Sequence, residues 1–324
     1  MLVRVYYLPG SSPARHVATP APSAAAAPSA FAGPPGSSVL AAPPVPGDGR
    51  FYLGVSSSQK DLAAYDAAAG VSQPAVFGGY TQGSDGSVAA VLSFARDLPG
   101  TIPMVSWGVN FRGGAVTDGS ADAYLRAQAA AVIAYGRPVF IRLDWEMNGN
   151  WYPEWSSSTV SPSAYVASWQ HVWTIFHDAG VTNAAFVWCP NVGDFGGVPW
   201  TDWYPGSAYV DWVGMDAYPK PSNLTAYVSG AGGLDAFAQY AEQIGKPAML
   251  AEWAPGDSAD PAADFDAVFS WATRYPDAVK ALLYFNFSGG GQDYLLTDDP
   301  TGAGLVRQFV EQNRADLSGV GGTG

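Results

Sequence analysis

The sequence has little positive charge. Its 15 Lys and Arg residues stand against 28 Asp and Glu residues, for a formal net charge of −13 at pH 7. Binding the phosphates of a nucleic acid requires a basic surface, so we expect no nucleic-acid partner. No apolar run reaches the length that a helix needs to cross a bilayer, so no membrane span is expected either.

Cysteine and histidine are also scarce. Cys189 is the only cysteine, which excludes a disulfide framework, and no Cys-x-x-Cys pair or other metal-ligand cluster is present. His16 falls near the N-terminus, while His171 and His177 fall in one helical stretch as ordinary surface or hydrogen-bonded residues. We expect no metal and no cofactor. For the acidic segment 256–266 we favour a solvated loop that leads into a helix. A calcium site is the alternative.

The chain divides by composition into three parts. Residues 1–49 consist mostly of Ala, Pro, Ser and Gly, which bury too little apolar surface to fold, so a disordered leader or linker is predicted. Residues 50–314 form one predicted domain, and residues 315–324 a flexible tail. The start, MLVRVYYLPG, is not a clean signal peptide. The Ala/Pro-rich tract nevertheless resembles the wall-spanning spacers of exported bacterial proteins, so we expect a secreted or cell-wall-associated monomer.

Aromatic residues are abundant. They make up 14% of the chain and include 12 Trp and 17 Tyr. Flat rings of this kind suit a cleft that stacks against sugar rings. The alternative is that most of them fill the core, and composition alone does not decide between the two.

Eight short segments rich in Val, Ile, Phe, Tyr and Trp alternate with helical patterns, which predicts a (β/α)₈ barrel. An open doubly wound sheet is the alternative, but the first strand is followed by GVSSSQKDL and not by a glycine-rich phosphate loop. Amphipathic helices are predicted over 121–136, 163–180 and 234–245, two of them ending at Gly before the next strand. The predicted strands are 51–55, 75–80, 102–107, 138–143, 185–188, 210–215, 247–251 and 281–287.

Two carboxylates follow opposite strands of this predicted barrel. Glu146 comes just after the fourth strand and Glu252 just after the seventh. The active site of a (β/α)₈ barrel lies at these strand ends, so both side chains should face one cleft. Glycosidic cleavage needs one protonated and one ionised carboxyl group in such a cleft. The alternative is that both are ordinary loop carboxylates in salt bridges.

The residues around these glutamates resemble a known family. IRLDWEMNGNWYPEW is similar to the acid/base motif of glycoside hydrolase family 26, in which Glu-Met-Asn-Gly follows the fourth strand. FVWCPN resembles its fifth strand, WYPGSAYVDWVGMDAY its sixth, and KPAMLAEWAP the strand that carries its nucleophile. The resemblance covers about residues 50–312.

This resemblance implies a function and residue roles. It implies a retaining hydrolase of β-linked polysaccharide, with mannan as the first expectation and β-glucan or β-1,3-xylan as alternatives. Glu146 matches the acid/base, Glu252 the nucleophile and Tyr218 a tyrosine that hydrogen-bonds the nucleophile. Arg142 matches an arginine four residues before the acid/base, and Trp151 an aromatic residue of the sugar cleft.

The motif departs from the family at the position before the acid/base. The family usually has His there, whereas this chain has Trp145, whose indole has one donor and no acceptor. This weakens mannan specificity more than it weakens catalysis, and we still expect Trp145 among the substrate-binding residues. Strand alternation would place Arg142, Asp144 and Glu146 on one face, so Asp144 either forms a buried ion pair with Arg142 or binds sugar.

Further candidates lie at the strand ends. We expect Trp107, Trp188 and Trp253 to line the cleft. Polar side chains either contact sugar or hold neighbouring groups in place; these are Asn148, Asn191 and Asp216. Two other functions stay open: a catalytically silent carbohydrate-binding barrel, and an enzyme acting on envelope glycan or exopolysaccharide. Retention of both glutamates argues against the silent barrel.

Overall fold

The computed structural model describes residues 43, 45–47, 49–82, 86–110, 116–219, 223–255, 261–289, 292–313 and 317–318. The expected leader lies almost wholly outside these residues. So do most of the expected tail and residues 256–260 of the acidic segment.

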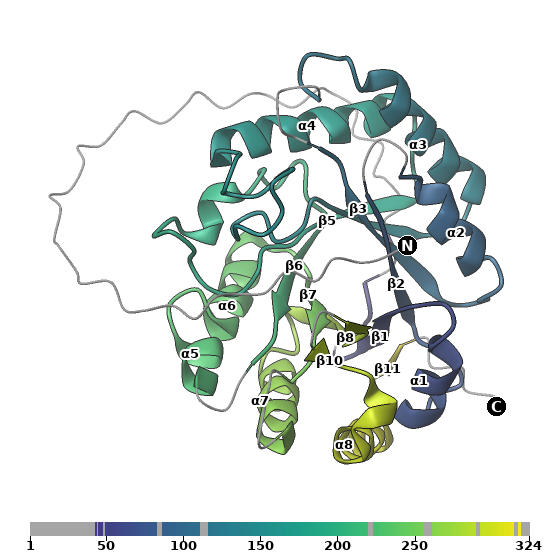
Figure 1. Cartoon of the computed structure of the whole chain (residues 1–324), viewed down its shortest axis with the longest axis vertical. Helices are drawn as coiled ribbons and strands as arrows, with labels where there is room; N and C mark the ends of the chain where they lie inside the picture. Colours follow the sequence, from purple (N-terminus) through teal and green to yellow (C-terminus); the bar gives the residue numbers. More distant parts are fainter. Residues whose placement is uncertain are drawn as a thin grey trace, which may run out of the picture.

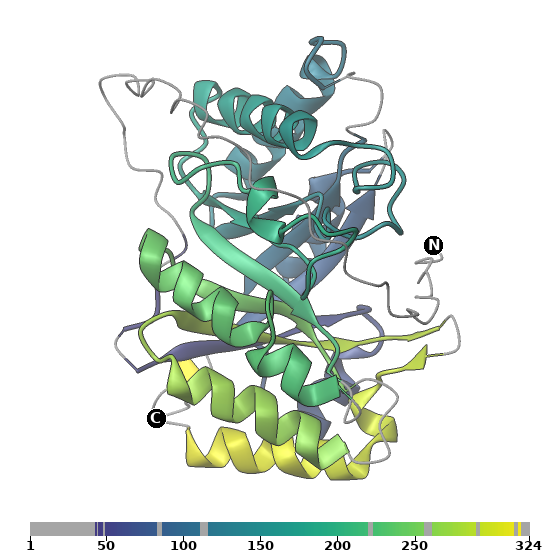
Figure 2. The same cartoon turned by 90° about the vertical axis from the view of Figure 1, so that its left-hand side faces the viewer.

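Eight parallel strands form a closed barrel (Figures 1 and 2). Each strand pairs with the next one along the chain, and β1 pairs with β8 from Tyr52–Ala281 to Ser57–Asn286, which closes the sheet. Each predicted strand overlaps one of these, so the predicted (β/α)₈ barrel is confirmed. The strands are β1 (Phe51–Ser57), β2 (Val76–Gln82), β3 (Ile102–Gly108), β4 (Val139–Leu143), β5 (Ala184–Trp188), β6 (Trp212–Ala217), β7 (Ala248–Trp253) and β8 (Val279–Asn286).

Helices surround the barrel, and Figure 1 shows α5, α6, α7 and α8 following one another along one side of it. The two predicted glycine stops are confirmed, because Gly136 and Gly245 end their helices with φ of 73° and 65°. The helices are α1 (Leu62–Ala69), α2 (Val88–Ala95), α3 (Asp122–Tyr135), α4 (Pro162–Asp178), α5 (Leu224–Ser229), α6 (Leu234–Ile244), α7 (Pro261–Arg274) and α8 (Pro300–Gln312).

Three features depart from a regular repeat. Between β5 and β6 the chain forms the short 3-10 helix η2 (Trp200–Trp203) where other units have an α-helix. β9 (Ser288–Gly289) and β10 (Gln292–Asp293) form a small hairpin after β8. β11 (Leu317–Ser318) pairs with the start of β1. None of the helices in the described residues has both the length and the apolar character needed to cross a membrane.

Tryptophan fills much of the space between the strands and the helices. Nine of the 12 Trp residues are among the largest fully buried side chains, so most of them belong to the core. Trp271 illustrates this, since its indole donates a hydrogen bond of 2.9 Å to the carbonyl of Leu234 on the neighbouring helix. The high aromatic content is therefore mainly a property of the core, and only a minority of these rings are free to meet a ligand.

Candidate active site

The two glutamates lie where the barrel strands end. Glu252 belongs to β7, and Glu146 follows the end of β4 by three residues. Asp144 and Glu146 have positive φ values of 40° and 54°, which turn the chain sharply after β4. Both glutamates are buried, at 6% exposure for Glu146 and 4% for Glu252.

Three side chains donate hydrogen bonds to Glu252. Tyr80 Oη donates to Oε1 over 2.7 Å, and Arg142 Nη2 donates to the same oxygen. Tyr218 Oη donates to Oε2 over 2.6 Å. Burial of the two tyrosines and the nearby Glu252 charge raise their pKa values well above the ordinary value, so both remain donors. These three donors hold both oxygens of the Glu252 carboxyl group in place.

Arg142 is held by a second carboxylate inside the barrel. Its Nη1 donates to both oxygens of Asp216 over 2.8 and 2.9 Å, and its Nε donates to Ser106 over 2.8 Å. Cys189 Sγ donates to Asp216 over 3.2 Å. Burial, together with Asp216, raises the pKa of the Cys189 thiol, which therefore stays protonated. These contacts fix the guanidinium that faces Glu252.

Glu146 has a different environment. Trp151 Nε1 donates to Oε2 over 2.6 Å, and Asn191 Nδ2 donates to Oε1. Burial first, and the charge of Glu252 second, raise the pKa of Glu146 to about 7, while these two hydrogen bonds oppose the shift. Glu146 thus keeps its proton through the mildly acidic range, while Glu252 is surrounded by donors.

Asn148 acts on Glu146 through Asn191. Its Nδ2 donates to the carbonyls of Asn191 and Gly193 over 2.8 and 3.0 Å, and its Oδ1 accepts the backbone N–H of Asn191 over 2.8 Å. The side chain is 1% exposed. It holds the loop after β5, and the Asn191 side chain on that loop contacts Glu146.

The three strand-end tryptophans do not line the cleft, which corrects our expectation. Trp107, Trp188 and Trp253 are at most 1% exposed. Trp107 Nε1 donates to Tyr124 of α3 over 3.0 Å, and Trp253 packs against Phe265 of α7 with ring centroids 5.2 Å apart. Each Trp neighbours an inward-facing strand residue, so alternation turns its ring outward toward the helices. The inward neighbours are Ser106, Cys189 and Glu252.

Asp144 also departs from expectation. Arg142 pairs with Asp216 and Glu252, not with Asp144. Asp144 is fully buried and accepts the backbone N–H of Val109, because the positive φ after β4 interrupts the alternation on which the ion pair depended. Burial raises its pKa well above the ordinary value, which favours the neutral carboxyl. Neither the ion pair nor a sugar contact fits this position.

Trp145 lies beneath the site with 1% exposure, so it offers almost no surface to a sugar. The Arg142 guanidinium lies 5.1 Å from the centre of its ring. Tyr80 and Tyr152 contact the ring edge to face, with centroids 5.6 and 5.3 Å away. The buried indole therefore packs against Arg142 and supports it. This corrects the expectation that Trp145 binds substrate.

Tyr80 is the main residue that sequence reasoning missed. It lies two residues before the end of β2, so the rule that strand ends carry the site would have included it. Ser106 and Cys189 were missed as well. Ser106 stands in no motif, and Cys189 stands in FVWCPN as a lone cysteine, for which the sequence indicated no role. Pairing across the barrel interior, which no local pattern shows, brings Tyr80 to Glu252, Ser106 to Arg142 and Cys189 to Asp216.

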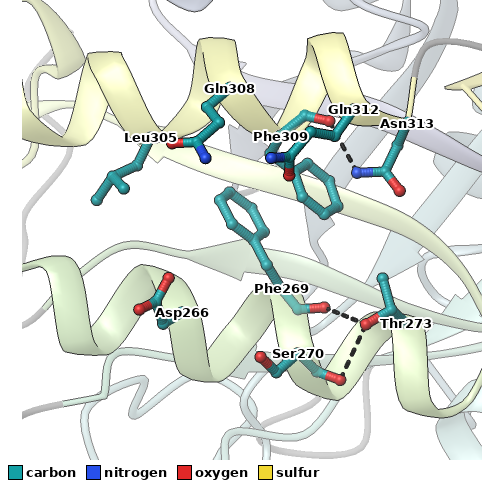
Figure 3. A pocket seen from close by; sticks show the side chains of 9 residues that line it. All are labelled: Asp266, Phe269, Ser270, Thr273, Leu305, Gln308, Phe309, Gln312 and Asn313. Atoms are coloured by element: carbon teal, nitrogen blue, oxygen red, sulfur yellow. Dashed lines mark hydrogen bonds between the residues drawn. The ribbon is translucent and has the colours of Figure 1, made fainter.

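A separate hollow of about 300 Å³ lies outside the barrel between α7 and α8 (Figure 3). Phe269 and Phe309 stack there with ring centroids 3.9 Å apart. Asp266 is the single acidic residue in the lining. The two buried glutamates, Glu146 and Glu252, lie elsewhere, at the ends of the barrel strands. Within the residues described, no group of three or more His, Cys, Asp or Glu is placed to hold a metal ion.

Comparison with known proteins identifies relatives of this chain. Residues 123–272 match the profile of glycosyl hydrolase family 26. Endoglucanase H of Acetivibrio thermocellus is 30% identical over 65% of this chain, and the mannan endo-1,4-beta-mannosidase A and B of Caldalkalibacillus mannanilyticus is 33% identical over 36%. The matched parts cover 24% and 23% of those proteins, so this chain corresponds to about a quarter of each.

Solved structures share the fold. The modular endo-beta-1,4-mannanase of Cellulomonas fimi superposes with a TM-score of 0.65 at 19% identity, covering 84% of this chain and 74% of that one. The Bacillus subtilis mannanase BCman gives a TM-score of 0.57 at 19% identity, with coverage of 78% and 84%. At these identities the likeness establishes the barrel architecture.

Proposed function

Because this chain belongs to glycoside hydrolase family 26, we propose that it is a retaining glycoside hydrolase that cleaves β-linked polysaccharide. Glu146 serves as acid/base and Glu252 as nucleophile. The observation that carries the proposal is the contrast between the two carboxyl groups. Burial and a neighbouring charge raise the pKa of Glu146 to about 7, while Arg142 and two tyrosines donate to Glu252.

The first step forms a covalent ester. One oxygen of Glu252 bonds to C1 of the sugar as the bond from C1 to the glycosidic oxygen breaks. The departing oxygen keeps the electron pair of that bond and takes the proton of Glu146. A protonated acid buried beside an ionised carboxylate suits this step.

The second step reverses these roles. Glu146, now ionised, removes a proton from water as the water oxygen bonds to C1 and the ester bond returns its electron pair to Glu252. Esterification has removed the Glu252 charge that helped to raise the pKa of Glu146. The pKa of Glu146 is therefore lower in the intermediate, which favours its action as a base.

The substrate is a β-linked glycan, with mannan as the first candidate. β-Glucan is the second candidate, because the relative named an endoglucanase matches 65% of this chain and the one named a mannosidase matches 36%. Trp145 replaces the histidine that is usual for the family, and this departure supports keeping both mannan and β-glucan as candidate substrates. Such polymers do not cross membranes, so the proposed enzyme meets its substrate outside the cell.

A catalytically silent sugar-binding barrel is the competing function. It would have no need for a buried glutamate with a raised pKa, and burying Glu146 in this way costs stability. A protein that only binds sugar by stacking would also have no need for the buried ion pair between Arg142 and Asp216 next to Glu252.

Hydrolysis of a polymer panel tests the proposal. Mannan, glucomannan, lichenan, β-1,3-xylan and bacterial exopolysaccharide are incubated with wild type, Glu146→Ala and Glu252→Ala, and product anomers are followed by NMR. We expect cleavage of at least one polymer with retained configuration, and a loss of several orders of magnitude in each variant. Binding without cleavage on every polymer would support the silent barrel, and an inverted product would contradict the double displacement.

A further inference from the structure

Tyr80 has no role in the two-glutamate scheme, yet it contacts the nucleophile. Its hydroxyl donates to Glu252 Oε1 over 2.7 Å. β2 and β7 are not neighbours in the sheet, so this bond crosses the barrel interior. A phenol brought from a distant strand to a reacting carboxylate is a candidate for a function in the reaction itself.

The two oxygens of Glu252 are held differently. Oε1 accepts from Tyr80 and from Arg142, whose guanidinium carries a full charge. Among the described residues, Tyr218 is the one side chain that donates to Oε2, over 2.6 Å. A carboxylate oxygen has two lone pairs, so Oε1 is fully occupied while Oε2 keeps one lone pair for a bond to carbon.

We propose that Oε2 is the atom of Glu252 that attacks the sugar, and that Tyr80 with Arg142 binds Oε1 as the carbonyl oxygen of the covalent ester. The inference rests on the proposed double displacement. When the bond from Oε2 to C1 forms, negative charge leaves the carboxylate, and when water breaks that bond the charge returns. Donors on Oε1 stabilise the returning charge, so Tyr80 accelerates the second step more than the first.

Aromatic packing sets the position of Tyr80. Trp145 and Phe287 each meet its ring edge to face, with centroids 5.6 Å away on both contacts. The Arg142 guanidinium lies 5.7 Å from the centre of the same ring. The Trp145 indole has no acceptor, so it does not compete for the Tyr80 proton, which is left to Glu252. Trp145 and Phe287 are therefore positioning residues for Tyr80.

The two steps are separated with aryl glycosides whose leaving group needs no proton. Dinitrophenyl β-cellobioside and dinitrophenyl β-mannobioside are mixed with wild type and Tyr80→Phe, and dinitrophenol release and intact protein mass are followed. For Tyr80→Phe we expect steady-state turnover to fall roughly 10- to 100-fold, as expected for losing a hydrogen bond to a charged group. A burst near one equivalent and accumulated glycosyl-enzyme should accompany this fall.

Tyr65→Phe is the matched control. Tyr65 is a buried tyrosine of α1 whose hydroxyl is 3.5 Å from the Gly54 carbonyl, so the variant removes the same atom outside the site. We expect wild-type kinetics for it. Burst amplitude counts competent sites and thus separates misfolding from slow chemistry. Trp145→Phe, which leaves the Tyr80 hydroxyl but loosens its ring, should show a weaker form of the same burst.

The outcomes are distinguishable. Tyr80→Phe turnover within about twofold of wild type, or slower turnover without accumulated ester, would overturn the assignment of Tyr80 even if Glu252→Ala is inactive. If Tyr80→Phe fails to fold, absence of a burst in Trp145→Phe would overturn it. Wild type without turnover on any polymer or aryl glycoside would overturn this inference and the proposed function together.

Discussion

The Trp145 indole lies against the Arg142 guanidinium, whose central carbon is 5.1 Å from the centre of the ring. Both side chains are at most 1% exposed, so this contact is made without water. A buried guanidinium loses hydration, and the face of an indole returns part of that loss. The indole thus supports the cation that contacts Glu252.

Trp145→His should destabilise the fold. The smaller imidazole leaves a cavity and places a polar nitrogen in an apolar pocket, so we expect a loss of about 2–4 kcal/mol in the free energy of unfolding. Urea denaturation measures it. Trp173→His, at a half-buried site on α4, is the matched control and should cost clearly less. Equal losses of unfolding free energy in the two variants would show that the contact between Trp145 and Arg142 does not add to stability.

The pH dependence of polysaccharide cleavage should follow Glu146. Its pKa is raised to about 7, and the acid must be protonated to donate to the leaving oxygen. We therefore expect kcat/KM to fall as pH rises through about 7. With dinitrophenyl glycosides, the rate of ester formation measured in the burst should show no such fall, because that leaving group needs no proton. An alkaline limb of the same position on both substrates would contradict the assignment of Glu146 as acid.

Glu146→Gln should stabilise the protein at alkaline pH. The folded-state pKa of Glu146 is raised from 4.5 to about 7, so folding favours the protonated form. Its stability contribution is full below about 4.5 and is lost as pH rises through about 7, on the order of 3 kcal/mol in all. Gln stays neutral, so its advantage over wild type in urea should grow from pH 5 to pH 8. The exposed Glu154→Gln control should show no such growth.

Much of the fold was predictable because barrel strands and helices have local periodicities. The eight strand segments and the glycines that end α3 and α6 are local patterns, and the structure bears them out. Trp107 and Trp253 were predicted to line the cleft, but their rings point outward. The alternation of side chains along a strand would have predicted this outward direction. Once Glu252 is placed inward, its neighbour in the strand must point outward.

Other parts of the site depend on information that is not local. Asp144 fails the alternation rule because the backbone takes a positive φ there, and an L residue rarely signals this in sequence. Tyr80 reaches Glu252 only because the sheet closes, which brings two strands distant in sequence to one interior. A motif identified the glutamates, but the closed barrel determined which donors meet each carboxylate oxygen.

Cys189 should be unreactive in the native protein. Its thiol is fully buried beside Asp216, and burial keeps it protonated, whereas thiol reagents attack the thiolate. Because the chain has a single cysteine, one labelling event reports on it alone. We expect labelling in native buffer to be limited by unfolding and to become rapid in concentrated urea. Rapid labelling in native buffer would show that solvent reaches the interior of the barrel near Arg142.

Asn191→Ala should move the alkaline limb of activity upward in pH. Asn191 donates to Glu146 Oε1, and this bond lowers the pKa of Glu146 against the larger effect of burial. Removing the donor disfavours the ionised form, so Glu146 should keep its proton to higher pH. Trp151→Phe removes the donor on Oε2 and should shift the limb in the same direction. Profiles of kcat/KM against pH for the three proteins measure this. An unchanged limb in both variants, with the fold intact, would mean that another group sets the alkaline limb.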